Sequence, residues 1–178
     1  MSTTPIVRLA TAADPRALAR VQVASWQRAY RGIVPLAFLA NYTVAKRARR
    51  WEAILAEPLP GARTWVCEVE GRVEGLASVL RSRDGDASLG ELGALYVHPE
   101  HWGTGMGHAL HQIALSHLDA EGYGGALLWV LADNERATRF YGAHDWQLDG
   151  ADKTVDFGGT GLRELRMAHP LGSAPPCS

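Results

Sequence analysis

The chain is poor in cysteine and contains no long apolar segment. Its 178 residues include only two cysteines, Cys67 in a strand-like run and Cys177 near the C-terminus, which do not make a disulfide framework. No apolar run approaches the ~18 residues that are needed to span a bilayer. The first ten residues, MSTTPIVRLA, also lack the charged and then apolar pattern of a signal peptide. These absences predict a cytoplasmic protein with reduced thiols and no membrane segment.

Acidic residues are absent from one long segment. Between Pro15 and Trp51 there is no Asp or Glu, although the net charge of the whole chain is only -1. The near-neutral total gives no signature of nucleic-acid binding. The positive segment has two interpretations, a solvated helical face or a surface that attracts anionic groups. It carries eight basic residues: Arg16, Arg20, Arg28, Arg31, Lys46, Arg47, Arg49 and Arg50.

Hydrophobic residues make up 47% of the chain and charged residues 21%, which is typical of a globular protein. Apolar spacing predicts helices over residues 15–30 and 44–56, another after residue 105 and another after Asn134. Alternating or continuous apolar runs predict strands at 6–10, 64–82 (with a turn at 70–71), 89–97, 126–131, 146–150 and 162–168. We therefore predict an α/β (α+β) fold, a mixed sheet with helices on both faces. Residues 1–170 form a single domain in this interpretation, and residues 171–178 a disordered tail.

Three glycines stand at alternate positions in HPEHWGTGMGHAL, residues 98–110, where a strand ends and a helix must start. Gly103, Gly105 and Gly107 leave the backbone bare, so a phosphate can approach the free N–H groups of the helix N-terminus. A P-loop does not fit, because no lysine lies between Gly103 and Leu110. The dinucleotide fingerprint does not fit either, because the glycines are spaced G-x-G-x-G. The alternatives are a phosphate or pyrophosphate site and a loop that is merely tight.

The stretch from Leu89 to Trp146 resembles the core of the GNAT superfamily of N-acetyltransferases. The family signature, Q/R-x-x-G-x-G/A after a strand, is matched by residues 102–107 except that Trp102 replaces Gln or Arg. The pattern N-x-x-A-x-x-F-Y of Asn134, Ala137, Phe140 and Tyr141 is equally characteristic. The resemblance covers about residues 5–169 and implies a mostly antiparallel sheet of 6–7 strands.

The resemblance implies acetyl-CoA as donor and a small-molecule primary amine as acceptor, with no metal. The pantetheine arm would lie beside the strand 89–97, which splays from the next strand to hold the thioester. Asn134 reaches the pantetheine amides or is a plain N-cap. The implied cofactor-binding residues are Leu95, Tyr96, Val97, Gly103, Thr104, Gly105, Met106, Gly107, His108, Asn134 and Ala137.

Amide formation from a thioester needs a base for the ammonium, a donor for the developing oxyanion and an acid for the leaving thiolate. The resemblance implies a tyrosine near the CoA sulfur on the helix after the splayed strand, so Tyr141 is the candidate acid, with a core aromatic as the alternative. It also implies a base carboxylate fourteen residues before Gly105, at Glu91, whose apolar neighbours would raise its pKa. The alternative for Glu91 is an ordinary outward-facing glutamate. The backbone N–H of Val97, or of a neighbouring residue, is the candidate oxyanion donor.

The first two helices usually line the acceptor side in this family, which implicates Trp26, Tyr30, Arg28 and Arg31. Because the segment is positive, we predict an acidic, amino-acid-like amine clamped by Arg28 or Arg31. Some of these arginines could instead bind the 3′-phosphate of CoA or face solvent.

Four histidines, His98, His101, His108 and His111, are interpreted as surface or loop residues, because their spacing is not that of a metal site. The other functions considered are a protein N-terminal or lysine acetyltransferase and a non-catalytic acyl-CoA or nucleotide-binding module. We expect neither nucleic acid nor membrane as a partner, and a homodimer is one candidate assembly.

Overall fold

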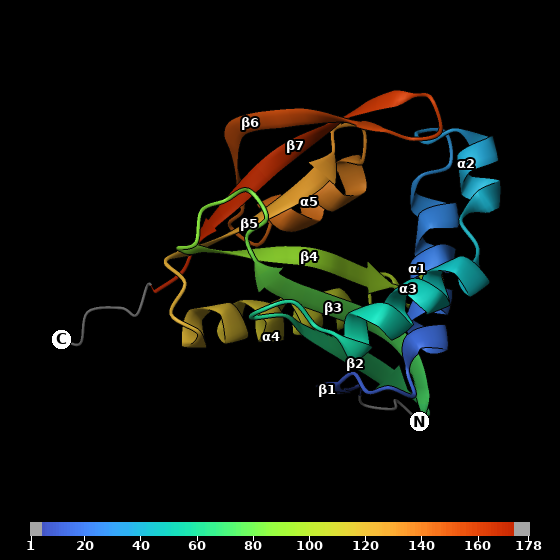
Figure 1. Cartoon of the computed structure of the whole chain (residues 1–178), viewed down its shortest axis with the longest axis horizontal. Helices are drawn as coiled ribbons and strands as arrows, with labels where there is room; N and C mark the ends of the chain where they lie inside the picture. Colours follow the sequence, from blue (N-terminus) through green and yellow to red (C-terminus); the bar gives the residue numbers. More distant parts are fainter. Residues whose placement is uncertain (1–4, 173–178) are drawn as a thin grey trace.

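The computed structural model describes residues 5–172, which form a seven-stranded sheet and five α-helices (Figure 1). The strands are β1 (Ile6–Leu9), β2 (Arg63–Val69), β3 (Arg72–Arg81), β4 (Leu89–Val97), β5 (Gly125–Leu131), β6 (Gln147–Asp156) and β7 (Gly161–Pro170). The helices are α1 (Pro15–Ala29), α2 (Leu36–Asn41), α3 (Val44–Ala56), α4 (Met106–Ala120) and α5 (Glu135–Gly142), with a 3-10 turn, η1 (Pro99–His101). The predicted tail lies outside the described residues from residue 173 onward.

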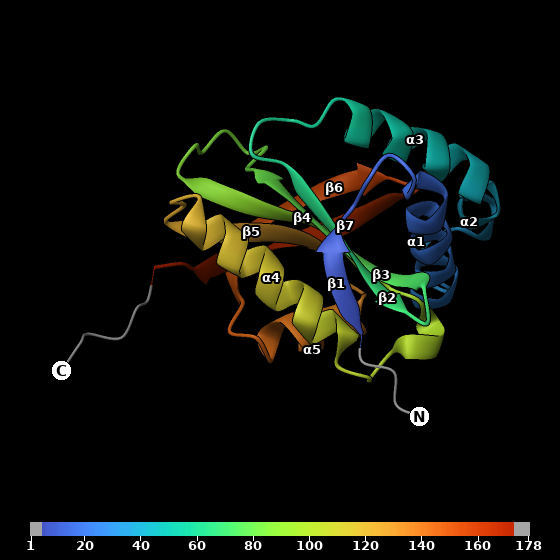
Figure 2. The same ribbon diagram turned by 90° about the horizontal axis from the view of Figure 1, so that it is seen from below.

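The predicted fold class is confirmed. The strand order is β1-β2-β3-β4-β5-β7-β6, and within the described chain only β4 and β5 pair in parallel. Helices α4 and α5 cover one face of the sheet, and α1 and α3 cover the other (Figure 2). Each face therefore has its own apolar core, around Leu110 and Leu128 on the α4 side and around Leu18 and Leu76 on the α1 side.

Two features differ from the predicted elements. Helix α2 was not predicted, because its six residues, LAFLAN, are too few to show a helical period. Strands β6 and β7 each have ten residues and are longer than predicted. Most residues of β6, QLDGADKTVD, are exposed and polar, so its sequence does not show the alternation of apolar and polar residues that predicts a strand. No helix among residues 5–172 is long and apolar enough to cross a membrane.

Strands β4 and β5 pair over a short stretch and then diverge. Their register covers three positions, Leu89 with Gly125, Gly90 with Ala126 and Glu91 with Leu127. Beyond residue 91, β4 stays paired with β3, with a register irregularity near Gly93. Residues 92–97 consequently present an unpaired edge toward β5, and the sheet has a gap at its centre.

Candidate active site

The glycine loop forms the N-terminus of α4. Gly103 and Gly105 have φ angles of 80° and 87°, which residues with a side chain rarely adopt. Gly105 is the N-cap, and no side chain caps this helix. The N–H of Ala109 donates to the Gly105 carbonyl at 3.0 Å. The amides of residues 106–108 precede that bond, so they have no acceptor within the helix and are free to bind an anion.

A cavity of about 250 Å³, which we call the loop cavity, lies in front of these amides. Met106 is 1% exposed, so its side chain belongs to the core and only its amide can face a ligand. The lining combines the glycine loop with the end of β4 and one side of α5: Ser25, Leu95, Val97, His101, Trp102, Gly103, Gly105, Gly107, His108, Arg136, Ala137, Phe140 and Tyr141. Seven of the predicted cofactor residues are thereby brought together.

A second cavity of about 480 Å³, the aromatic cavity, lies on the other side of the gap. Its walls come from α1, β4, β5, β6 and β7 and include both predicted acceptor aromatics, Trp26 and Tyr30. Tyr96, predicted as a cofactor residue, also lines this cavity rather than the loop cavity. The other aromatic walls, Trp129 and Phe157, were not singled out in the sequence.

A smaller space of about 100 Å³, the junction cavity, lies between the other two. It shares Leu95 and Tyr141 with the loop cavity, and Tyr30 and Trp129 with the aromatic cavity. Asn134 lines the junction cavity, and its side chain also caps α5 by accepting from the Ala137 N–H at 3.2 Å. The three cavities form a continuous set of lining residues across the gap between β4 and β5.

Tyr141 stands where the loop cavity and the junction cavity meet. Burial raises the pKa of its phenol above the ordinary value, and the nearby Tyr96 adds to the effect. The hydroxyl therefore keeps its proton at any physiological pH and can serve as a donor.

Glu91 is the last residue of β4 that pairs with β5, and it lines the aromatic cavity. It is 1% exposed, and its carboxylate forms an ion pair with the Arg83 guanidinium. The Arg83 backbone N–H also donates to Glu91 Oε2 at 3.1 Å. These surroundings differ from the apolar ones expected from the sequence, because a guanidinium and a backbone amide contact the carboxylate. The hydrogen bond to Glu91 in turn raises the pKa of Arg83.

A family model described as the acetyltransferase (GNAT) family matches residues 25–146, which is more than half of the chain. The chain belongs to this GNAT family. The match includes β4, the glycine loop, α4, β5 and α5, which carry the loop cavity and the gap. The resemblance stated from Leu89 to Trp146 is therefore confirmed.

Relatives of this GNAT protein extend over different parts of it. The uncharacterized N-acetyltransferase YuaI of Bacillus subtilis is 29% identical over 94% of both chains. The mycothiol acetyltransferase of Frankia alni is 41% identical over 40% of this chain, a stretch that spans only 21% of that relative. Among solved structures, the PaiA N-acetyltransferase of Thermoplasma acidophilum, in complex with coenzyme A, superposes with a TM-score of 0.74. The two chains are 17% identical, and the superposition covers 94% of this chain and 99% of the PaiA chain. This similarity is one of fold.

Trp102 occupies the position where the GNAT signature has Gln or Arg. Its indole N–H donates to the Val97 carbonyl at 2.7 Å, and the Arg136 guanidinium stacks 3.5 Å from the ring centre. Burial lowers the pKa of Arg136, which lines both the loop and the junction cavity. The sequence had singled out Trp102 as a departure but gave no role to Arg136, although it stands inside the N-x-x-A pattern.

The predicted arginine clamp lies apart from the cavities. Arg28 and Arg31 are exposed, and neither lines the loop, aromatic or junction cavity. Trp26 instead stacks on Tyr42, with ring centres 4.1 Å apart, and contacts Tyr30 edge-on at 4.6 Å.

One histidine was placed wrongly from the sequence. His111 is 1% exposed and accepts a hydrogen bond from the Trp146 indole at 2.8 Å. It lies on the buried side of α4 with Ala114 and Leu118, three and seven residues further on. His108, one turn earlier, is exposed and bonds to His144 at 2.9 Å. Within residues 5–172, no three His, Cys, Asp or Glu side chains are grouped to hold a metal ion.

Proposed function

We propose that the chain transfers an acetyl group from acetyl-CoA to a primary amine of a small molecule, by direct attack of the amine on the thioester. The observation that carries this proposal is the junction cavity, where a phosphate-binding loop cavity and an aromatic cavity meet beside Tyr141. Two substrates entering from opposite sides would meet there with their reacting atoms together.

The donor lies in the loop cavity in this proposal. The pyrophosphate accepts from the amides of residues 103–108 at the positive end of α4. The pantetheine arm pairs with the free edge of β4 at residues 95–97 and ends beneath Asn134 and Ala137. A Cβ at Gly107 would meet only ordinary contacts with Phe140, at 3.5 Å, which leaves this glycine free to face the ligand.

The chemistry assigns each proton to a group. The ammonium of the acceptor gives its proton to the Glu91 carboxylate, directly or through a water, and the amine nitrogen attacks the thioester carbonyl carbon. The N–H of Val97 stabilises the oxyanion. The N–H of the neighbouring His98 donates to the Glu74 carbonyl of β3 at 2.8 Å. Because successive N–H groups of a strand point in opposite directions, the Val97 N–H faces the gap. The carbon–sulfur bond then breaks, the thiolate takes the Tyr141 proton, and the new amide nitrogen gives its extra proton to the Tyr141 phenolate, directly or through a water. The proton held by Glu91 passes to solvent when the products leave.

A small acceptor is favoured over a protein by the way in which the aromatic cavity is covered. The rings of Phe38 on α2 and Phe157 after β6 meet edge-on, with centres 5.2 Å apart. Both pack in one apolar cluster with Val34 and Leu39, so α2 and the β6–β7 turn are joined next to the wall of the cavity that Phe157 forms. A peptide chain passing through the site would need this contact to open.

An acidic acceptor clamped by Arg28 or Arg31 stays a prediction and is the alternative to a cationic acceptor, although neither arginine lines the three cavities. If such a clamp exists, Arg28→Ala or Arg31→Ala raises the Michaelis constant for the best acceptor, and added salt weakens its binding. Unchanged constants in both variants would remove the clamp from the proposal.

Release of free thiol from acetyl-CoA, measured against an amine panel and a peptide panel, tests the function. Turnover with small amines and none with peptides is the expected result. Turnover with peptides alone would establish the protein-acetyltransferase alternative. Acetyl-CoA binding without turnover on either panel would indicate a non-catalytic module.

A further inference from the structure

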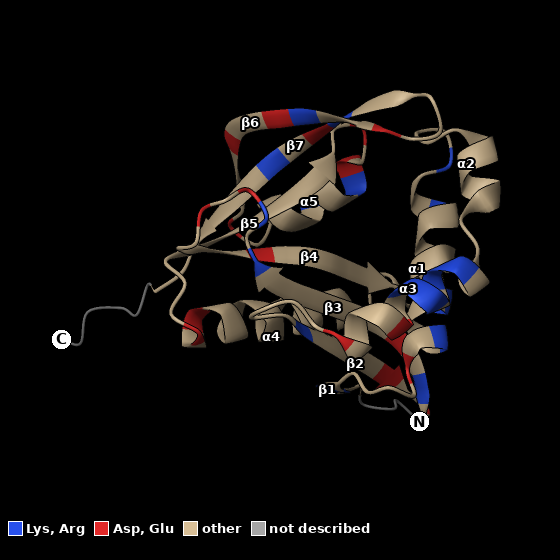
Figure 3. Ribbon diagram, in the orientation of Figure 1, with Lys and Arg blue, Asp and Glu red and all other residues tan. Residues whose placement is uncertain are grey.

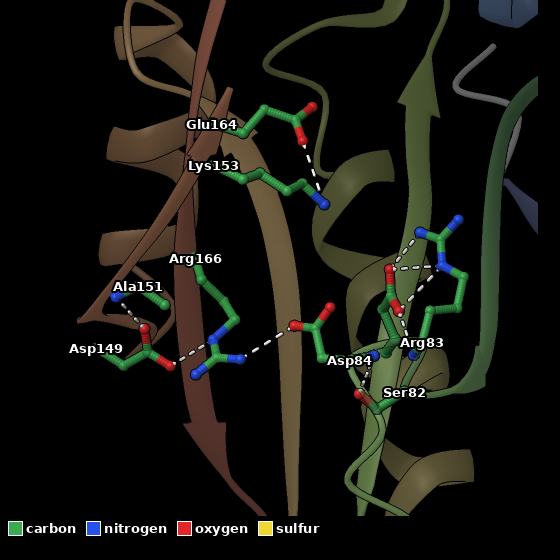
Figure 4. Close-up of polar contacts among 9 residues, drawn as sticks. Ser82, Arg83, Asp84, Asp149, Ala151, Lys153, Glu164 and Arg166 are labelled. Atoms are coloured by element: carbon green, nitrogen blue, oxygen red, sulfur yellow. Dashed lines mark hydrogen bonds and ion pairs between the residues drawn. The ribbon is translucent and has the colours of Figure 1, made fainter. Parts of the chain in front are cut away.

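A lysine of the protein already occupies the aromatic cavity. Lys153 on β6 places its ammonium 3.8 Å from the centre of the Trp129 ring. The same ammonium lies 3.5 Å from Glu164 Oε2 on β7 (Figure 4). A cation over an indole ring and beside a carboxylate is held by two independent attractions. The cavity therefore contains a formed subsite for an ammonium group, with Lys153 in it.

The other charges that line the cavity are committed to fixed partners. Glu91 pairs with Arg83, and Asp84 pairs with Arg166 at 3.0 Å (Figure 4). Glu91 accepts from both the backbone N–H and the side-chain N–H of Arg83. Glu164, in contrast, is held less firmly, because its partner Lys153 makes one contact at 3.5 Å with a side chain that is 43% exposed. An exposed pair of this kind contributes little to stability, so a ligand cation can replace Lys153 at low cost.

The positive charge of the segment 15–51 is directed elsewhere. Lys and Arg gather on α1 and α3 (Figure 3). Arg20 pairs with Glu74, and Arg47 lies 5.0 Å over the Tyr42 ring and lines a different cavity. The aromatic cavity itself is lined by two cations and three carboxylates.

We infer that the acceptor is an amine with a second cationic group, a diamine or a related polycation. This inference rests on the proposed function. The second cation displaces Lys153 from the face of Trp129 and from Glu164. Trp129 lines both the aromatic and the junction cavity, so a flexible diamine held there can extend its free amine toward Tyr141.

The inference is tested by removing the competing lysine. Lys153→Met vacates the subsite, so kcat/KM for 1,4-diaminobutane should rise, about threefold or more through KM, while that for glutamate falls or stays unchanged. Glu164→Gln should lower kcat/KM for the diamine about tenfold and leave butylamine within about twofold. Arg163→Met is the matched control, because Arg163 is exposed on the same hairpin, pairs with Asp152 and lines none of the three cavities. It should change neither substrate by more than about twofold.

Acetyl-CoA affinity and melting temperature, measured on each variant, separate a local effect from a folding defect. Three results would overturn the inference: glutamate outperforming every diamine, Lys153→Met lowering the rate with the diamine, or Glu164→Gln leaving that rate unchanged. Each of them still shows amine turnover and so leaves the proposed function standing. Failure of every amine to release thiol would instead refute the proposed function, and the inference with it.

Discussion

The two sides of the gap are built from different parts of the chain. The loop cavity depends on backbone, namely the amides at the start of α4 and the free edge of β4, and within the described residues its lining contains no carboxylate. The aromatic cavity depends on side chains from five elements and is lined by Asp84, Glu91 and Glu164. A backbone site suits a donor shared by a whole family. A side-chain site can be changed one residue at a time, and in the proposed function it would select the acceptor.

The largest effect is expected on the backbone side. Gly105→Glu places a carboxylate against the amides that receive the phosphates, and acetyl-CoA affinity should fall more than about 100-fold. Gly122→Glu is the matched control, because Gly122 has a φ of 84° and lies just beyond the other end of α4. Both variants carry the same left-handed strain, about 1–2 kcal/mol of stability. Calorimetry that shows equal affinity in the two variants would contradict the loop assignment.

Tyr141→Phe tests the point where the two sides meet. Without the phenolic proton the thiolate leaves slowly, so kcat should fall about 10²–10³-fold while the dissociation constant for acetyl-CoA stays within about threefold. Tyr123→Phe removes a hydroxyl that lies outside the three cavities and should have no such effect. Wild-type turnover of Tyr141→Phe, measured where chemistry limits the rate, would make Tyr141 a packing residue only.

Glu91→Gln tests the acceptor side. An amide cannot take the proton of the ammonium, so the rate should fall about 100-fold. The acidic limb of the pH–rate profile should disappear, because that limb reports protonation of the base. Glu68→Gln, at an ion pair with Arg8 outside the site, is the control. An acidic limb that persists in Glu91→Gln would place the base elsewhere.

The smallest expected effect is on the free energy of unfolding, through His111 on the buried side of α4. Burial, with smaller contributions from neighbouring histidines, lowers the pKa of His111 to about 4 from 6.5. Below pH 6.5 His111 is therefore protonated in the unfolded chain but stays neutral in the folded chain. The free energy of unfolding consequently falls as the pH drops toward 4. Urea unfolding at pH 7 and pH 5 should show a loss of about 2 kcal/mol that His111→Gln lacks and the exposed-site variant His108→Gln keeps. Equal losses in all three proteins would contradict the buried neutral histidine.

The same contrast explains what the sequence could predict. Gly103 and Gly105 are constrained by a local backbone conformation, so the glycine spacing predicts a loop that opens the amides at the start of α4. Trp129, Lys153 and Glu164 meet only through the pairing of β5, β6 and β7, where β6 shifts register between Leu148 and Asp152. No local sequence pattern therefore predicts that these three side chains are in contact.

Two other residues show the limits of composition and spacing. Glu91 was singled out by its place on a strand, but its partner Arg83 comes from the preceding loop and changes its surroundings. His111 carried a usable signal, since its spacing to Ala114 and Leu118 is that of a buried helical face. The lack of a metal-site spacing, on which the surface interpretation rests, excludes a ligand role but does not place a side chain at the surface.

The kinetic order of the reaction tests the central claim, that donor and acceptor are bound together across the gap. Direct attack requires a ternary complex, so initial rates measured at several acetyl-CoA and amine concentrations should give intersecting double-reciprocal lines. Burial raises the pKa of the Cys67 thiol to about 11, which leaves it without thiolate to carry an acetyl group. Because direct attack forms no acetyl-enzyme, protein incubated with labelled acetyl-CoA alone should retain no label after denaturation. Parallel lines together with a labelled acetyl-enzyme would contradict the account.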